Sequence, residues 1–302
     1  MSDPPLVVEI KRGSHEDGPG IRSVVFFKGC PLRCSFCHNP EAQDAGVEIA
    51  VSKDACIHCG KCGGACDGGA LDLDSQERID RARCVRCGAC AAVCPGNGLR
   101  RIGDSYEVDE LVAVLLRDLP FYHHSGGGIT LSGGECTMYP DYLESLLKRL
   151  KKWSLHIVLE TSGHFQYNRF ERQILPYLDL IFYDVKIADP ELHRVHTGVD
   201  NRLILDNLER LIHDRRVRVS PRVPLVPGIT ATEANLSGIV GVLRRIGADE
   251  VSLQPYNPLG LDMWERLGKE PPALPRSFMS QEEERSVRSL FAKLVGDRSR
   301  SR

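Results

Sequence analysis

Cysteines are concentrated in one stretch of this 302-residue chain, and their placement limits what the chain can be. Eleven of the twelve lie between Cys30 and Cys94, and only Cys136 lies beyond them. The N-terminus, MSDPPLVVEIKRG, lacks the pattern of a signal peptide, and no apolar run approaches the ~20 residues of a membrane span. We therefore expect a cytoplasmic protein. Because the cytosol keeps thiols reduced, these cysteines are better explained as metal ligands than as disulfides.

Charge and composition exclude some partners. Hydrophobic residues at 42% and charged residues at 26% are ordinary values for a globular protein. The formal net charge of −2 gives no electrostatic reason to expect a nucleic acid or a membrane surface as a partner.

We expect three regions: 1–50, which leads through the first cysteine group; 51–103, an insert rich in Gly, Cys and Asp; and 104–302, where strands and helices alternate. The pattern predicts buried strands at 23–28, 128–132, 156–160, 179–186, 217–226 and 250–256. It predicts helices at 108–119, 141–153, 205–213, 233–246 and 281–294. Such alternation implies parallel strands covered by helices. We predict an α/β fold, a partial (β/α)₆ barrel like a TIM barrel, rather than a flat doubly wound sheet.

The first cysteine group has the spacing C-x₃-C-x₂-C, at Cys30, Cys34 and Cys37, directly after the predicted strand 23–28. A 4Fe–4S cluster normally takes four cysteines, so three would leave one iron with an open position. Open metal positions bind substrates. The alternative is a zinc ion with His38 as its fourth ligand, although zinc sites favour C-x₂-C pairs.

The other two groups repeat the spacing C-x₂-C-x₂-C-x₃-C, which is the pattern of bacterial two-cluster ferredoxins. In that pattern the fourth cysteine of each run binds the other cluster. We therefore assign one 4Fe–4S cluster to Cys56, Cys59, Cys62 and Cys94, and a second to Cys66, Cys84, Cys87 and Cys90. The alternative is a pair of zinc knuckles. The first run has Asp67 where ferredoxins usually place proline, which concerns the turn and not the ligands.

The first cysteine group, with the DGPGIR sequence at 17–22, resembles the radical S-adenosylmethionine (SAM) superfamily. More narrowly, the chain resembles the activating enzymes of glycyl radical enzymes, which include pyruvate formate-lyase activase. The resemblance spans nearly the whole chain through HEDGPGIRSVVFFKGCPLRCSFCHNPE, GGGITLSGGE, LETSG, YDVK, PRVPLVPG and LQPYNPLG. It implies that SAM binds the open iron through its amino and carboxylate groups.

The resemblance also implies parts of a SAM pocket. Gly134, in the GGE motif that ends with Glu135, contacts the SAM amino group, and Phe36 and His38 beside Cys37 lie against the adenine. Asn257 stands where pyruvate formate-lyase activase carries histidine; asparagine can still form a hydrogen bond with the ribose or adenine. Cys136, where proline is common in the family, is expected to be a buried, unligated thiol.

Charged strand ends supply the other candidates. Lys186, which follows Asp184 and Val185, can pair with the SAM carboxylate or ribose, and Arg222 can meet the carboxylate. Asp184, Glu160 and Thr161 are candidates to bind a monovalent cation or polar groups of SAM. The alternative for each is a solvated strand end.

The function implied by the resemblance is radical transfer to a protein. Reduction of SAM by the first cluster yields a 5′-deoxyadenosyl radical, which takes a hydrogen atom from a glycine α-carbon of a large glycyl radical enzyme. We expect the insert to relay electrons from a donor such as flavodoxin or ferredoxin. One alternative is a radical SAM enzyme that acts on a different substrate. Another is a ferredoxin-like carrier without catalysis, which would need neither SAM nor a barrel.

Overall fold

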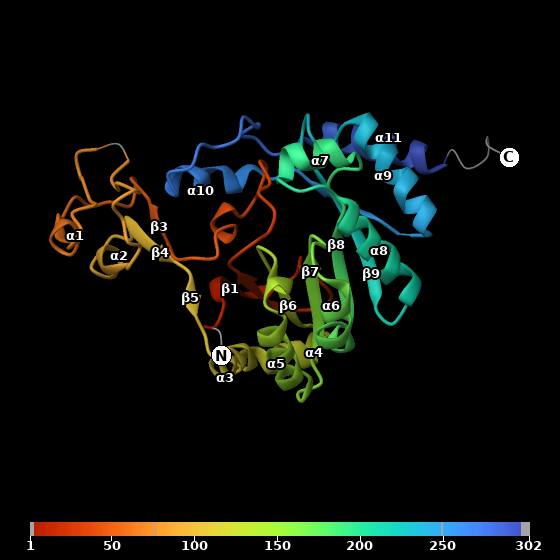
Figure 1. Ribbon diagram of the computed structural model, residues 1–302, viewed down its shortest axis with the longest axis horizontal. Helices are drawn as coiled ribbons and strands as arrows, with labels where there is room; N and C mark the ends of the chain where they lie inside the picture. Colours follow the sequence, from red (N-terminus) through yellow and green to blue (C-terminus); the bar gives the residue numbers. More distant parts are fainter. Residues whose placement is uncertain (1–2, 76, 249, 297–302) are drawn as a thin grey trace.

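The computed structural model describes residues 3–75, 77–248 and 250–296, where one sheet of eight strands forms the body (Figure 1). Six strands are parallel and neighbour one another in chain order: Arg22–Phe27 (β2), Gly128–Gly133 (β6), His156–Thr161 (β7), Leu180–Asp184 (β8), Arg218–Leu225 (β9) and Ser252–Pro255 (β10). A doubly wound sheet reverses its strand order at one point, whereas this order never reverses. The predicted fold class and its six strands are confirmed.

Helices connect and cover these strands. They are Val108–Leu115 (α3), Leu119–Ser125 (α4), Pro140–Lys151 (α5), Tyr167–Gln173 (α6), Pro190–Thr197 (α7), Arg202–Asp214 (α8), Glu233–Ile246 (α9), Leu261–Arg266 (α10) and Gln281–Gly296 (α11). In α5 the buried face consists of Leu143, Leu146, Leu147 and Leu150, and each buried leucine contributes about 1.5–3 kcal/mol.

The predicted helix 108–119 is wrong in one respect, because it is divided. Regular α-helix ends at Leu115, a 3-10 turn follows at Leu116–Asp118, and α4 begins at Leu119. Pro120 lies in the first turn of α4, and a proline there disfavours continuous helix through the preceding residues.

Two antiparallel strands extend the sheet beyond the prediction. Leu6–Ser14 (β1) pairs with β2, and Asp104–Ser105 (β5) pairs with β1. The register of β1 shifts twice, between Val7 and Glu9 and between Lys11 and Ser14. Such irregularities interrupt the alternation of buried and exposed side chains by which a strand is recognised in a sequence.

The cysteine-rich insert joins the barrel through a small sheet of Glu48–Val51 (β3) and Leu99–Ile102 (β4) (Figure 1). Between them lie two short helices, Lys61–Gly64 (α1) and Ala89–Ala92 (α2). The internal repeat is visible in the backbone: His58 and Gly60 adopt left-handed conformations, with φ of 54° and 75°, and so do Arg86 and Gly88 at the matching positions, with φ of 58° and 84°.

Arg22, the last residue of the DGPGIR sequence, braces the amino-terminal end of the barrel. Its fully buried guanidinium donates to Thr130 Oγ1 at 2.7 Å, to the carbonyl of Ile129 at 2.6 Å and to that of His156 at 3.0 Å. Burial lowers its pKa to about 10, although nearby carboxylates oppose the shift. The motif therefore ties β2, β6 and β7 together at the end opposite the cysteines.

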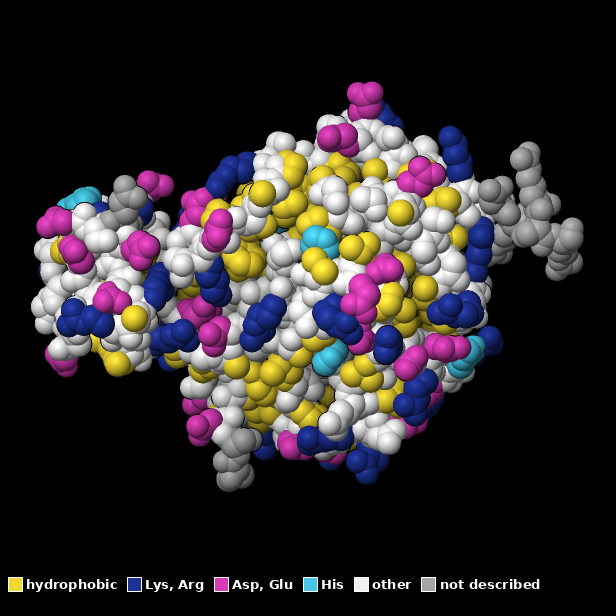
Figure 2. All heavy atoms as spheres, turned by 45° about the horizontal axis from the view of Figure 1, so that its top comes forward, with side chains coloured by type: hydrophobic (Ala, Val, Ile, Leu, Met, Phe, Trp, Pro, Cys, Tyr) yellow, Lys and Arg dark blue, Asp and Glu magenta, His cyan; other side chains and the backbone are white. Residues whose placement is uncertain are grey.

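The surface shows no sorting of charge by sign on the face in Figure 2, where positive and negative side chains intermingle over both the barrel and the protruding insert. Within the described residues, no helix combines the length and the apolar character that a bilayer span requires.

Candidate active site

The first cysteine group lies on the loop at the carboxyl end of β2, here called the cysteine loop (residues 28–43). Hydrogen bonds fix it from several sides. The Arg33 and Ser35 amides donate to carbonyls at the end of α7, at 2.7 and 2.8 Å, and Gln43 Nε2 donates to the Cys34 carbonyl at 3.1 Å. A loop held along its length presents its thiols in a defined arrangement.

The segment after β10 clamps the same loop from outside. Trp264 Nε1, on α10, donates to the Cys37 carbonyl at 3.1 Å, and Lys269 Nζ donates to the Pro40 carbonyl at 3.1 Å. Gly260 lies so close that a Cβ atom there would stand 2.1 Å from the His38 carbonyl oxygen. Sequence patterns gave no sign of this clamp, because each contact joins positions more than two hundred residues apart.

The three thiols of the cysteine loop are partly or wholly buried. Burial raises the pKa of Cys30 to about 12, and it also raises the pKa values of Cys34 and Cys37. The ammonium of Lys186 opposes each of these shifts. Buried thiols that ionise only with a strong positive charge beside them fit a site where bound iron supplies that charge. The residues present therefore fit a cluster held by three thiolates.

Gly134 lies where β6 meets the cysteine loop. Its amide donates to the Phe27 carbonyl at 2.8 Å. A Cβ atom at this position would stand 2.2 Å from the carbonyl oxygen of Gly29 and 2.4 Å from that of Ala42, so only glycine fits. The close approach leaves the backbone of Gly134 beside the cysteines.

Glu135 is fully buried, and its carboxylate has four hydrogen bonds. It accepts from Thr137 Oγ1 at 2.7 Å, from Thr161 Oγ1 at 2.8 Å, and from the amide and hydroxyl of Ser162 at 2.8 and 2.6 Å. The side chain thus joins the loop after β6 to the loop after β7. In the structure the Glu135 carboxylate holds these two loops together. A contact between Glu135 and SAM stays a prediction.

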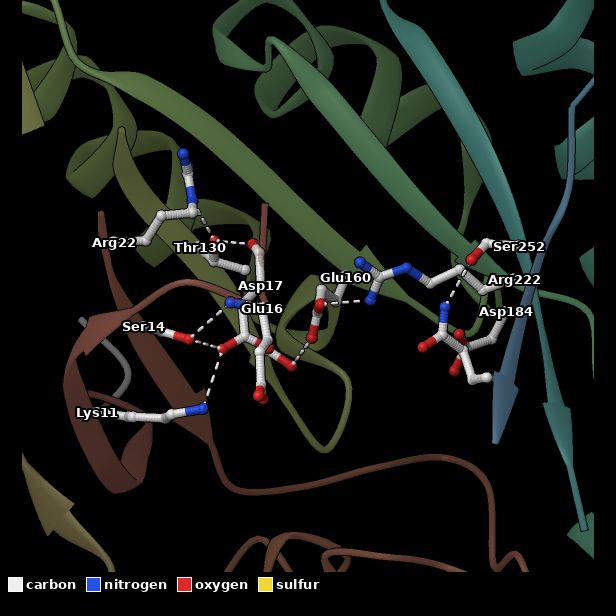
Figure 3. Close-up of polar contacts among 12 residues, drawn as sticks. Lys11, Ser14, Glu16, Asp17, Arg22, Thr130, Glu160, Asp184, Arg222 and Ser252 are labelled. Carbon is white, nitrogen blue, oxygen red and sulfur yellow. Dashed lines mark hydrogen bonds and ion pairs between the residues drawn. The ribbon is translucent and has the colours of Figure 1, made fainter. Parts of the chain in front are cut away.

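Glu160 and Arg222 face each other inside the barrel (Figure 3). They form an ion pair at 2.7 Å, and Ser132 Oγ donates to the other Glu160 oxygen at 2.7 Å. The guanidinium carbon also lies 3.2 Å from the centre of the Phe182 ring. Burial raises the pKa of Glu160, while Arg222 and Ser132 stabilise its charged form. The role of Ser132 was not foreseen from the sequence.

Lys186 and Asp184 form a second pair at the end of β8, at 2.6 Å. Burial disfavours the charged amine of Lys186, but Asp184 and the thiols of Cys30 and Cys34 outweigh that cost and raise its pKa. The structure therefore brings Lys186 close to the cysteine loop, and its contact with SAM stays a prediction.

The remaining predicted contacts are more dispersed. Phe36 packs near His196, with 6.4 Å between ring centres, and His38 is exposed with Nδ1 3.1 Å from Asn39 Oδ1. Val185 is buried in the main core, so its side chain faces away from solvent.

Asn257 is exposed and accepts from the Leu259 amide at 2.9 Å, which caps a 3-10 turn. Cys136 is completely buried, and burial raises its pKa.

In the insert, the thiols gather across the repeat. A hollow is lined by Cys56, Cys59, Cys62 and Cys94, together with apolar side chains such as Ile57 and Leu99. On the other side, the charges of Cys84, Cys66 and Cys87 raise the pKa of Cys90 beyond the effect of burial, which places Cys66 near that set. Both observations support the predicted exchange of fourth cysteines.

The zinc alternatives require side chains that converge on one ion. Among residues 3–75, 77–248 and 250–296, no three His, Cys, Asp or Glu side chains are grouped closely enough for a single metal ion.

A partial barrel whose first parallel strand ends in a C-x₃-C-x₂-C loop defines a radical SAM enzyme. A family model described as the radical SAM superfamily matches residues 24–236. The chain is 38% identical over 275 residues to the choline trimethylamine-lyase activating enzyme of Oleidesulfovibrio alaskensis, with 88% of each chain covered. It is 35% identical over 291 residues to the trans-4-hydroxy-L-proline dehydratase activating enzyme of Clostridioides difficile, with 95% of this chain and 96% of that one covered. The chain therefore belongs to the radical SAM superfamily and, within it, to the activating enzymes of glycyl radical enzymes.

Solved structures show the same fold at greater distance. Streptococcus suis SuiB bound to the precursor peptide SuiA matches with a TM-score of 0.52 at 12% identity, and the match covers 89% of this chain and 44% of that one.

Proposed function

We propose that this chain installs a glycyl radical on a large partner enzyme by hydrogen-atom abstraction. The observation that carries the proposal is the cysteine loop: three buried or half-buried thiols beside the glycine contact of Gly134 and the ammonium of Lys186. A 4Fe–4S cluster held by these thiolates would supply the electron for reductive cleavage of SAM to methionine and the 5′-deoxyadenosyl radical that abstracts the glycine hydrogen.

The residues of the chain hold and orient the reactants. Cys30, Cys34 and Cys37 are the thiolates for the cluster. The backbone at Gly134 is the surface for the SAM amino group, and Lys186 and Arg222 are the cations for its carboxylate or ribose. Fixing the reacting atoms in this way supplies a large part of a rate enhancement without any acid or base.

Each of the two cations proposed to meet SAM is paired with a carboxylate inside the barrel. Arg222 is paired with Glu160, and Lys186 with Asp184. A carboxylate on the ligand can exchange for Glu160 at the guanidinium, since both present the same geometry. Binding of a monovalent cation by Asp184, Glu160 and Thr161 stays a prediction.

Residues 51–103 are proposed to hold two further 4Fe–4S clusters, one on Cys56, Cys59, Cys62 and Cys94 and one on Cys66, Cys84, Cys87 and Cys90. The thiol groupings across the repeat support this assignment. We expect these clusters to relay electrons from a donor such as flavodoxin or ferredoxin to the cysteine loop.

The test is anaerobic reconstitution of the chain with iron and sulfide, followed by incubation with SAM, a reductant and a candidate partner. Named relatives suggest a panel of choline trimethylamine-lyase, trans-4-hydroxy-L-proline dehydratase and isethionate sulfite-lyase. We expect a SAM-dependent glycyl signal in electron paramagnetic resonance on at least one partner. Cys34→Ala should abolish it, whereas Cys136→Ser, which alters a thiol outside the three groups, should retain it.

The outcomes separate the alternatives. A glycyl signal from Cys34→Ala would refute the cluster assignment. Cleavage of SAM without a glycyl signal on any partner would favour a radical SAM enzyme with a different substrate.

A further inference from the structure

The two cysteine sets of the insert share one type of sulfur hydrogen bond. The Ala70 amide donates to Cys66 Sγ at 3.3 Å, and the Leu99 amide donates to Cys94 Sγ at 3.4 Å. In each case the acceptor is the fourth cysteine of its run, and the donor lies four or five residues later. These two bonds occupy equivalent positions of the internal repeat, so each proposed cluster receives one of them.

Arg78 breaks this equivalence. Its Nη1 donates to Cys56 Sγ at 3.4 Å. The same side chain lines the hollow formed by Cys56, Cys59, Cys62 and Cys94, here called the Cys56 set. The other four cysteines, Cys66, Cys84, Cys87 and Cys90, are here called the Cys84 set. Among the described residues, no side chain donates to a sulfur of the Cys84 set. Arg78 also has a φ of 62°, a conformation that non-glycine residues adopt at a cost. A charged donor held on one sulfur in this way distinguishes one cysteine set from the other.

The neighbouring arginines are directed elsewhere. Arg81 donates to the Ile49 carbonyl at 2.6 Å, Arg83 donates to the Gly68 carbonyl at 3.0 Å, and Arg86 pairs with Asp44 at 3.2 Å. Among these arginines, therefore, Arg78 is the one that carries its charge to a thiol.

We infer that Arg78 is a positioning residue that raises the reduction potential of the cluster held by Cys56, Cys59, Cys62 and Cys94 above that of its partner cluster. Reduction adds negative charge to a cluster and its thiolates. A guanidinium stays charged at any working pH, and a hydrogen bond from it to a ligand sulfur stabilises the reduced form more than the oxidised form. The inference rests on the proposed presence of both clusters in the insert.

The placement of the two sets gives this difference a direction. The ion pair of Arg86 with Asp44 ties the Cys84 set to the cysteine loop, because the adjacent Gln43 accepts from the Cys30 amide at 3.1 Å. The Cys56 set includes Cys62 on α1, which lies at the far end of the insert in Figure 1. The cluster that Arg78 contacts is therefore the more easily reduced one, so transfer of an electron from it to the other cluster of the insert is uphill.

The experiment is an anaerobic redox titration of the reconstituted holoenzyme, with each cluster followed by electron paramagnetic resonance. In the unsubstituted protein, the two clusters of the insert should titrate at different potentials. Arg78→Gln should lower the higher of the two and leave the lower one unchanged, and Arg78→Lys should retain part of the difference. Lys53→Gln is the matched control, because Lys53 lines the same hollow and is exposed.

Two results would overturn the inference. One is that both insert clusters titrate at the same potential in the unsubstituted protein. This measurement does not depend on whether a variant folds. The other is a shift in Arg78→Gln no larger than that in Lys53→Gln at equal iron content. Neither readout involves SAM cleavage or a glycyl radical, so failure of the proposed function is seen separately, in the assay with partner enzymes.

Discussion

Replacement of Gly134 by alanine tests whether the contact between β6 and the cysteine loop controls the chemistry. The added Cβ would stand 2.2 Å from the Gly29 carbonyl oxygen and 2.4 Å from that of Ala42. A relaxed carbon–oxygen contact is about 3.3 Å, so each gap is too short by about 1 Å. Both opposing atoms belong to the backbone, which cannot rotate out of the way as a side chain can. The cysteine loop and the GGE backbone must therefore move apart by roughly that distance.

The consequence for activity can be estimated from that displacement. A shift of about 1 Å in a site that works by positioning costs on the order of a hundredfold in rate. The steric strain is expected to cost a further 1–3 kcal/mol, roughly, in stability. The assay is formation of 5′-deoxyadenosine from SAM with dithionite as reductant, which requires neither the natural electron donor nor a partner enzyme.

Gly241→Ala is the matched control, because Gly241 is an exposed residue of α9 whose added Cβ would meet no atom within 4 Å. Alanine is the better helix former by about 1 kcal/mol, so this variant should be slightly more stable and equally active. Gly134→Ala with the rate and melting temperature of the unsubstituted protein would show that the contact does not position the site.

Three other predictions concern the supports of the site. Glu135→Gln should lower the free energy of unfolding by about 2–4 kcal/mol, since it turns an amide toward the donors of Ser162, and denaturant unfolding of the anaerobic protein measures it. Burial lowers the pKa of His193 in the folded protein, so on acidification the unfolded chain binds a proton at a higher pH than the folded chain does. The melting temperature should therefore fall as the pH drops below about 6.5, the ordinary histidine pKa, and through the lower pKa of the folded state. His193→Gln should make the melting temperature less dependent on pH in this range. Trp264→Phe removes the donor to the Cys37 carbonyl, worth about 1 kcal/mol, and should speed loss of cluster iron to a chelator roughly fivefold; an unchanged rate would show that the clamp does not hold the loop.

The sequence predicted those parts of the molecule that depend on local order. The six parallel strands were predicted because apolar runs and helical periodicity are properties of short windows. The cysteine sets were assigned for a similar reason, since their spacing repeats within 51–103. Lys186 was chosen as a candidate because it follows a predicted strand, and the carboxyl ends of parallel strands meet at one end of a barrel.

The supports of the site could not be predicted in this way. Trp264 and Lys269 reach carbonyls in the cysteine loop across most of the chain, and a carbonyl carries no sequence signal of its partner. Arg22 was recognised only as part of a motif near the cysteines, yet its side chain acts at the other end of the barrel. The motif thus identified the family, but it did not show which contacts each of its residues makes.

The paired charges inside the barrel make ligand binding an exchange. If a SAM carboxylate takes Arg222, Glu160 is left in a buried position with Ser132 as its remaining donor, and burial already favours its neutral form. An unpaired buried carboxylate is costly, so either a proton or a cation must replace the guanidinium. Asp184 lies at the end of the neighbouring strand and is likewise paired through its own lysine. Charge balance at Glu160 is thus met by either a proton or a cation, and a monovalent cation bound by Asp184, Glu160 and Thr161 stays a prediction.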